Sequence, residues 1–173
     1  MGGFAGAYAA GLLTLVLWVA AWTPLVALLE YAVHRWVQHK GVRLLDPALY
    51  HRLSHREHHR GSLHHEFVDT TPKDCLLPTM PAWLGLAAWA FAVGPWHSVV
   101  IPMAALLAWA LLYAWLWTRI HRAIHGVEHN WFERSGIVFR FFSTHHLKHH
   151  RTAGVNFGAV FPWTDVVFGT RCA

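Results

Sequence analysis

Charged side chains are absent from two long stretches of this 173-residue chain. Residues 1–29 and residues 76–117 contain no Lys, Arg, Asp or Glu, whereas segments 30–75 and 118–173 each hold seven of the 14 Lys and Arg. Charged residues make up only 13% of the sequence, against about 25% in a typical soluble domain. This pattern favours a membrane protein and gives no reason to expect a nucleic-acid partner.

Three apolar segments within these stretches are candidates to cross a bilayer, at about 7–29, 76–93 and 99–117. About 20 residues of helix cross a hydrocarbon core. We expect Pro24 to kink the first segment, and Gly94 to Ser98 to form the turn between the other two. The predicted fold is all-α: an integral membrane helical bundle of about three spans, forming a single domain over residues 1–173.

The basic residues predict the orientation of the bundle. With three spans, segments 30–75 and 118–173 lie on the same side of the membrane, and the positive-inside rule makes that side cytoplasmic. The N-terminus then lies outside. The alternative for the first segment is a cleaved signal peptide, but residues 1–20 lack the basic residues that begin one.

Histidine is the second unusual feature, since fifteen of the 16 histidines fall in the two predicted cytoplasmic segments. Residues three or four apart on a helix share a face. We expect short helices at about 47–60 and from a cap at Ser143 and Thr144, with several imidazoles on one side. The spacing yields four clusters: His34 and His39; His55, His58 and His59; His121 and His125; His146, His149 and His150.

Ten clustered imidazoles predict two metal ions rather than one, because a structural zinc site takes four ligands. Neutral imidazole binds iron, zinc, copper and nickel. A single His pair on a helix is usually a surface feature, but four clusters on one side of a membrane protein favour a dimetal site in a cytoplasmic helical cap. Candidates to support the ligands by hydrogen bonds are His51, Asp69, Glu128, His129, His145 and Asp165.

Four motifs carry a resemblance to a known family. They are Glu30-Tyr31-Ala32-Val33-His34-Arg35 with His39, the run His55-Arg56-Glu57-His58-His59, the pair His121 and His125, and the run from His145 to His150. The last is followed by Asn156-Phe157-Gly158 and by Asp165 to Thr170. Over about residues 30–170 the chain resembles the fatty acid hydroxylase / sterol desaturase superfamily of membrane-bound, His-rich di-iron oxygenases. The resemblance adds Asn156 to the supporting residues.

The sequence departs from the family pattern at two positions and is similar to more than one branch. Thr164 stands where the family often has Trp, and Ser143 stands where a Pro is common. The HxxxxH form of the first box resembles fatty acid 2-hydroxylases. The short length is similar to that of bacterial carotenoid ring hydroxylases, although the third box of those enzymes is HxxxxH and this chain has HxxxH.

The resemblance implies an enzyme that hydroxylates or desaturates a lipid C–H bond with O2. It implies two Fe, with Zn possible in isolated protein, and no catalytic residues beyond the metal ligands. We expect an external electron donor, either a ferredoxin or a cytochrome b5-like protein with its reductase. A metal transporter is disfavoured because the spans contain neither His nor acid, whereas transport sites lie near the bilayer midplane. A non-enzymatic zinc-binding membrane protein remains as a rival.

Overall fold

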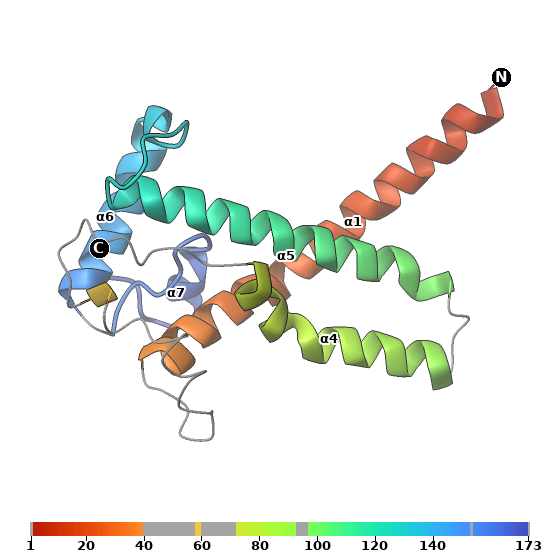
Figure 1. Ribbon diagram of the computed structural model, residues 1–173, viewed down its shortest axis with the longest axis horizontal. Helices are drawn as coiled ribbons and strands as arrows, with labels where there is room; N and C mark the ends of the chain where they lie inside the picture. Colours follow the sequence, from red (N-terminus) through yellow and green to blue (C-terminus); the bar gives the residue numbers. More distant parts are fainter. Residues whose placement is uncertain (1, 40–57, 60–71, 93–96, 153, 173) are drawn as a thin grey trace.

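The computed structural model describes residues 2–39, 58–59, 72–92, 97–152 and 154–172, and within these ranges it contains helices and no strand. The predicted all-α class is therefore confirmed for the described part of the chain (Figure 1). The elements are α1 (Gly2–Ala32), the π-helix η1 (Val33–His39), α4 (Pro72–Ala92), α5 (His97–Ile124), the 3₁₀-helix η2 (Glu133–Ser135), α6 (Ile137–Arg151) and α7 (Trp163–Val167).

Two of these helices are long and apolar enough to cross a membrane. They cover Gly11–His39, which joins α1 to η1, and Ser98–Ile124 of α5. Large apolar side chains such as Leu12, Leu17 and Leu112 are exposed on them, as expected where lipid rather than water is the solvent. The apolar part of α4, Thr79–Ala92, is shorter, so the three-span topology stays a prediction.

α5 is the central helix and packs against both α1 and α4. Figure 1 shows α4 and α5 as an antiparallel pair crossed by α1, with α6 and α7 gathered at the end away from the α4–α5 connection. Val26 and Leu106 are buried where α1 meets α5. Two indoles reinforce this contact: Trp22 Nε1 donates to the Pro102 carbonyl and Trp109 Nε1 to Thr23 Oγ1, each at 3.0 Å.

α1 includes Pro24 within one continuous helix, and the expected kink there stays a prediction. Two helix boundaries differ from the sequence expectation. α5 continues to Ile124, beyond the predicted end at residue 117, so that His121 belongs to the same helix as the span. α6 begins at Ile137, after Gly136 with φ 61°, rather than at Ser143. Most of the helix predicted at 47–60 lies outside the described residues, which include only His58 and His59 of it, both helical.

Candidate metal centre

The first histidine pair lies on η1, the π-helix that continues α1. Residues five apart on an α-helix point about 140° away from each other, which would separate His34 from His39. In a π-helix the repeating hydrogen bond joins residues five apart, and the same two side chains come to one side. Their ring centroids are 5.0 Å apart. The sequence pattern gave no sign of this π-helix.

The first of two histidine groups contains five residues from three separate segments. Their candidate ligand nitrogens lie within 4.8 Å of one another. The Nε2 atom of His121 is 3.1 Å from those of His58 and His125. The Nε2 atom of His146 is 3.1 Å from that of His125 and 3.0 Å from that of His150. The five-histidine group is His58, His121, His125, His146 and His150.

The second group brings together four histidines from η1, the 58–59 segment and α6. Their candidate ligand nitrogens also lie within 4.8 Å of one another, and His39 Nε2 is 3.1 Å from His149 Nε2. The two groups are adjacent, because the rings of His59 and His150 stack at 4.2 Å between centroids. The four-histidine group is His34, His39, His59 and His149.

Backbone carbonyls set the orientation of two imidazoles in the four-histidine group. His34 Nδ1 is 2.5 Å from the Phe157 carbonyl oxygen, and His149 Nδ1 is 2.7 Å from that of Val155. A carbonyl only accepts, so in each ring Nδ1 carries the proton and Nε2 presents a lone pair. This is the arrangement in which a second partner prepares a histidine to bind metal.

The nitrogen spacing fits a metal with right-angled bonds. Two nitrogens about 2.1 Å from one metal are about 3.0 Å apart at a right angle and about 3.4 Å apart in a tetrahedron. The neighbouring Nε2 pairs of the five-histidine group lie at 3.0 to 3.1 Å. Hydrogen bonds between imidazoles would pair the Nε2 atoms two by two. Instead, the Nε2 atoms of His121, His125 and His146 each lie close to two other Nε2 atoms. The side chains present therefore fit a metal ion with more than four nitrogen ligands.

Burial keeps several of these imidazoles neutral, as metal binding requires. Burial, with a smaller contribution from the nearby imidazoles, lowers the pKa of His58 to about 3 and that of His59 to about 4. Burial likewise lowers the pKa of His149 to about 3, against the opposing hydrogen bond to Val155. At neutral pH, protons do not compete with a metal for these nitrogens.

The chain after α6 folds under the histidines and is fixed by Asn156 and Asp165, both fully buried. Asn156, at φ 55°, donates to the His145 carbonyl at 3.0 Å and accepts from the Cys172 amide at 2.8 Å. Asp165 accepts from the amides of Phe157 and Gly158 at 2.7 and 2.8 Å. Asp165 thus holds the peptide whose carbonyl orients His34.

Asp165 also has His145 as a partner, with His145 Nε2 3.1 Å from Asp165 Oδ2. Burial alone would raise the pKa of Asp165, but hydrogen bonds from His145, Thr170 Oγ1 and the two amides outweigh it and hold the pKa below its usual value. His145 is buried yet lies outside both histidine groups. Asn156 and Asp165 therefore support the backbone under the site, and His145 is a hydrogen-bond partner of both.

Glu30 and Tyr31 have structural roles that the sequence did not assign. Buried Glu30 accepts from the amides of Val160 and Phe161 at 2.8 and 2.9 Å and from the Tyr113 hydroxyl at 3.1 Å. The Tyr31 hydroxyl is 3.0 Å from Thr170 Oγ1. The sequence feature that could have indicated a buried role for Glu30 is its position as a single acid directly after 29 residues without charge.

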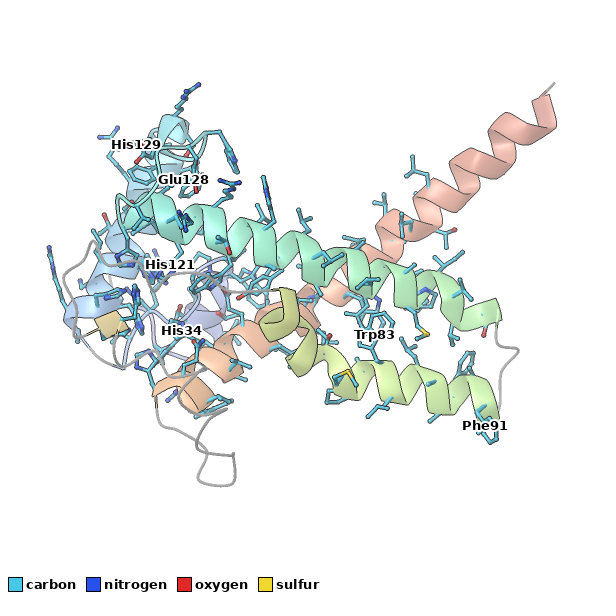
Figure 2. All side chains as sticks on the ribbon, viewed as in Figure 1. His34, Trp83, Phe91, His121, Glu128 and His129 are labelled. Atoms are coloured by element: carbon cyan, nitrogen blue, oxygen red, sulfur yellow. The ribbon has the colours of Figure 1, made fainter. Side chains whose placement is uncertain are left out.

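Two other candidates lie away from the histidine groups. Glu128 binds Arg119 and, at 3.0 Å, Arg122 Nε. His129 is exposed and pairs with Glu133 at 2.9 Å. Figure 2 shows Glu128 and His129 beyond the end of α5, apart from His121 and His34. The support predicted for these two residues is therefore not seen, because each has a local partner. His51, His55 and Asp69 lie outside the described residues.

Nine of the ten predicted ligands thus fall into two adjacent groups, and the tenth, His55, is not described. The sequence model of the fatty acid hydroxylase family matches residues 15–170. The chain belongs to the fatty acid hydroxylase family. No curated protein and no solved structure gives a significant match. Membership in the fatty acid hydroxylase family makes the chain an oxidoreductase, and its apolar helices and histidine groups fit a membrane-associated, metal-binding one.

Proposed function

We propose that the chain is a membrane-bound di-iron hydroxylase that uses O2 to hydroxylate a C–H bond of a fatty-acyl or related lipid. The observation that carries this proposal is the pair of adjacent histidine groups, with five and four converging imidazoles. Imidazole suits both zinc and iron. Five converging nitrogens, with four neighbouring pairs 3.0 to 3.1 Å apart, exceed the four of a tetrahedral zinc site, and this favours iron.

In this proposal, the five-histidine group and the four-histidine group each hold one iron. Two bound irons would supply the redox chemistry by which O2 attacks an unactivated C–H bond. One oxygen atom enters the product and the other leaves as water, which requires two electrons and two protons. A separate redox protein supplies the electrons, either a ferredoxin or a cytochrome b5-like protein with its reductase.

The protein side chains hold the ligands and limit access of water. The carbonyls of Phe157 and Val155 keep the Nε2 lone pairs of His34 and His149 directed at the metal. The Phe157 ring is buried and lies 5.4 to 5.7 Å from the rings of His34, His39 and His149. It forms an apolar wall beside the four-histidine group, which suits a hydrocarbon substrate better than a polar one.

The site is proposed to lie just inside the cytoplasmic surface, at the end of a three-span bundle whose N-terminus is outside. His34 and His121 follow directly on α1 and on the apolar part of α5. A lipid chain rising from the bilayer would meet the histidine groups there. This position supports a lipid as the substrate.

The decisive experiment is elemental analysis of detergent-purified protein from iron-supplemented cells, followed by mass spectrometry of the lipids of cells that express it. About two irons per chain and a new hydroxylated lipid are expected. A desaturated lipid or a hydroxylated carotenoid or sterol would keep the chemistry and change the substrate or outcome. Two zincs with no O2-dependent product after iron reconstitution would favour the non-enzymatic zinc protein. Less than one metal per folded chain would overturn the proposal.

A further inference from the structure

The C-terminal part of the chain presents an apolar face that no described side chain covers. On and just after α7, Trp163 is 42% exposed, Val166 56%, Val167 65% and Phe168 40%. Between residues 154 and 170 the only charged side chain is Asp165, which is fully buried. Contiguous apolar surface of this kind marks a contact with another molecule or with a membrane.

The same segment contacts a part of α5 that lies within the candidate membrane span. Phe161 stacks on Tyr113, with centroids 6.2 Å apart, and meets Trp109 edge-on at 5.9 Å. Both partners lie in the apolar helix Ser98–Ile124. Tyr113 is four residues before residue 117, the predicted end of the span, and hence about 6 Å inside it. Figure 1 shows α7 and the chain leading to it between α1 and α5.

Irregular backbone at membrane depth is tolerated only where the protein satisfies its polar groups. Two buried carboxyl groups meet this condition for four backbone amides of the segment. Glu30 accepts the amides of Val160 and Phe161, and Asp165 accepts those of Phe157 and Gly158. The amide of Thr164 donates to the Phe161 carbonyl at 3.0 Å.

We propose that residues 157–168 form a re-entrant segment that enters the cytoplasmic half of the bilayer between α1 and α5. In this arrangement the face formed by Trp163, Val166, Val167 and Phe168 contacts lipid acyl chains. The proposal rests on the membrane-spanning role of α5 in the proposed function. Lipid is favoured over a second protein because the face has no charged residue and because α1, against which α7 packs, also exposes large apolar side chains.

The location of this face relates it to the chemistry. Phe168 stacks on buried Tyr31 at 4.4 Å, Tyr31 meets Phe157 at 5.7 Å, and Phe157 lies 5.4 Å from the His149 ring. The lipid-contacting face is therefore separated from the four-histidine group by two aromatic rings.

The test uses an environment-sensitive fluorophore (NBD) on a single cysteine in the full chain, reconstituted with its metal into phosphatidylcholine vesicles. The labelled variants are Val167→Cys, Leu111→Cys on α5 as a membrane reference, and Arg151→Cys on α6 as a water reference, each with Cys75→Ser and Cys172→Ser. Leu111 and Arg151 are both exposed. Quenching by aqueous iodide is compared with quenching by lipids that carry a nitroxide at carbon 5 or carbon 12.

The label at Val167 is expected to be quenched several-fold more by the carbon-5 nitroxide than by iodide, as at Leu111, while the label at Arg151 shows the reverse. If iodide quenched the label at Val167 while the nitroxide lipids quenched the label at Leu111, the re-entrant segment would be ruled out and α5 would still span the membrane. Iodide quenching at both would overturn the membrane proposal as well. If neither iodide nor the nitroxide lipids quenched the label at Val167, protein would cover this face, and the proposed lipid contact would be wrong. Val166→Cys repeats the measurement independently.

Discussion

At the scale of single residues, the two histidine groups make separable predictions about metal content. His149 belongs to the four-histidine group, whereas His58 belongs to the five-histidine group. His149→Ala removes one of four nitrogens and is expected to lower iron from about two to about one per chain and to reduce product formation to background. His58→Ala should do the same through the other group. Elemental analysis and lipid mass spectrometry on the same preparations measure both.

The matched control is His129→Ala, because His129 is exposed and pairs only locally with Glu133. It should leave metal content and product unchanged. Full activity and two irons in His149→Ala would remove this residue from the ligands. Equal loss in His129→Ala would indicate a general effect of histidine removal and not a metal site.

Glu30 is a positioning residue whose carboxylate accepts two amides and the Tyr113 hydroxyl. Glu30→Gln keeps the shape but turns one acceptor into a donor that faces an N–H group. The buried mismatch should cost about 1 to 3 kcal/mol of unfolding free energy, seen as a lower melting temperature of the metal-loaded protein. Tyr113→Phe loses one hydrogen bond and should cost about 1 kcal/mol. Equal melting temperatures for Glu30→Gln and wild type would contradict this role.

At the scale of elements, the chain between α6 and α7 depends on a glycine at position 158. A Cβ built there would lie 2.4 Å from the Phe161 carbonyl oxygen and 2.7 Å from Thr164 Oγ1. Gly158→Ala must therefore shift backbone that Asp165 and Glu30 hold, and is expected to destabilise the protein by about 1 to 3 kcal/mol. Gly85→Ala is the control, since nothing lies within 4 Å of its added Cβ. Thermal unfolding measures both variants. Equal melting temperatures for Gly158→Ala and Gly85→Ala would contradict the argument.

The contrast between helices and loops also explains how much the sequence could predict. Spacings of three and four residues identified His121 with His125 and His146 with His150, because a helix fixes which neighbours share a face. The same spacing placed His149 with His146 and His150, whereas His149 belongs to the four-histidine group. The His34–His39 pair was proposed as well, but its geometry comes from a π-helix that spacing alone cannot reveal. The role of Glu30 depends on the amides of Val160 and Phe161, far away in the chain. That of Asp165 depends on how the loop before it folds back to bring the amides of Phe157 and Gly158 to its carboxylate. Local patterns do not encode such contacts. That the grouped histidines bind metal stays a prediction.

At the scale of the whole molecule, removal of the metal should make stability depend on pH. Burial holds the folded-state pKa of His58, His59 and His149 at about 3 to 4, against an ordinary value of 6.5. Below about pH 6.5 the unfolded chain therefore binds more protons than the folded one, and stability falls as pH falls. Chelator-treated protein in detergent should melt at a lower temperature at pH 5.5 than at pH 7.5. A melting temperature that is flat over this range would mean that these imidazoles are not buried in the metal-free fold.

The orientation of the whole bundle follows from the number of spans. α1 and α5 are each long enough to cross the membrane. If α4 did not cross, segments 30–75 and 118–173 would lie on opposite sides, and seven of the 14 basic residues would be outside, against the positive-inside rule. The histidines of η1 and α6 would then also be on opposite sides, although His39 and His149 lie 3.1 Å apart. Both arguments favour three spans.

Cysteine labelling in intact cells can test this topology. In a background with Cys75→Ser and Cys172→Ser, Gly3→Cys should react with a membrane-impermeant maleimide from outside. Arg171→Cys should react only after the cells are permeabilised. The same two variants labelled in inverted vesicles should exchange their behaviour. If Arg171→Cys reacted in intact cells, the site would face outward, where no cytoplasmic redox protein could supply the electrons that the proposed reaction needs.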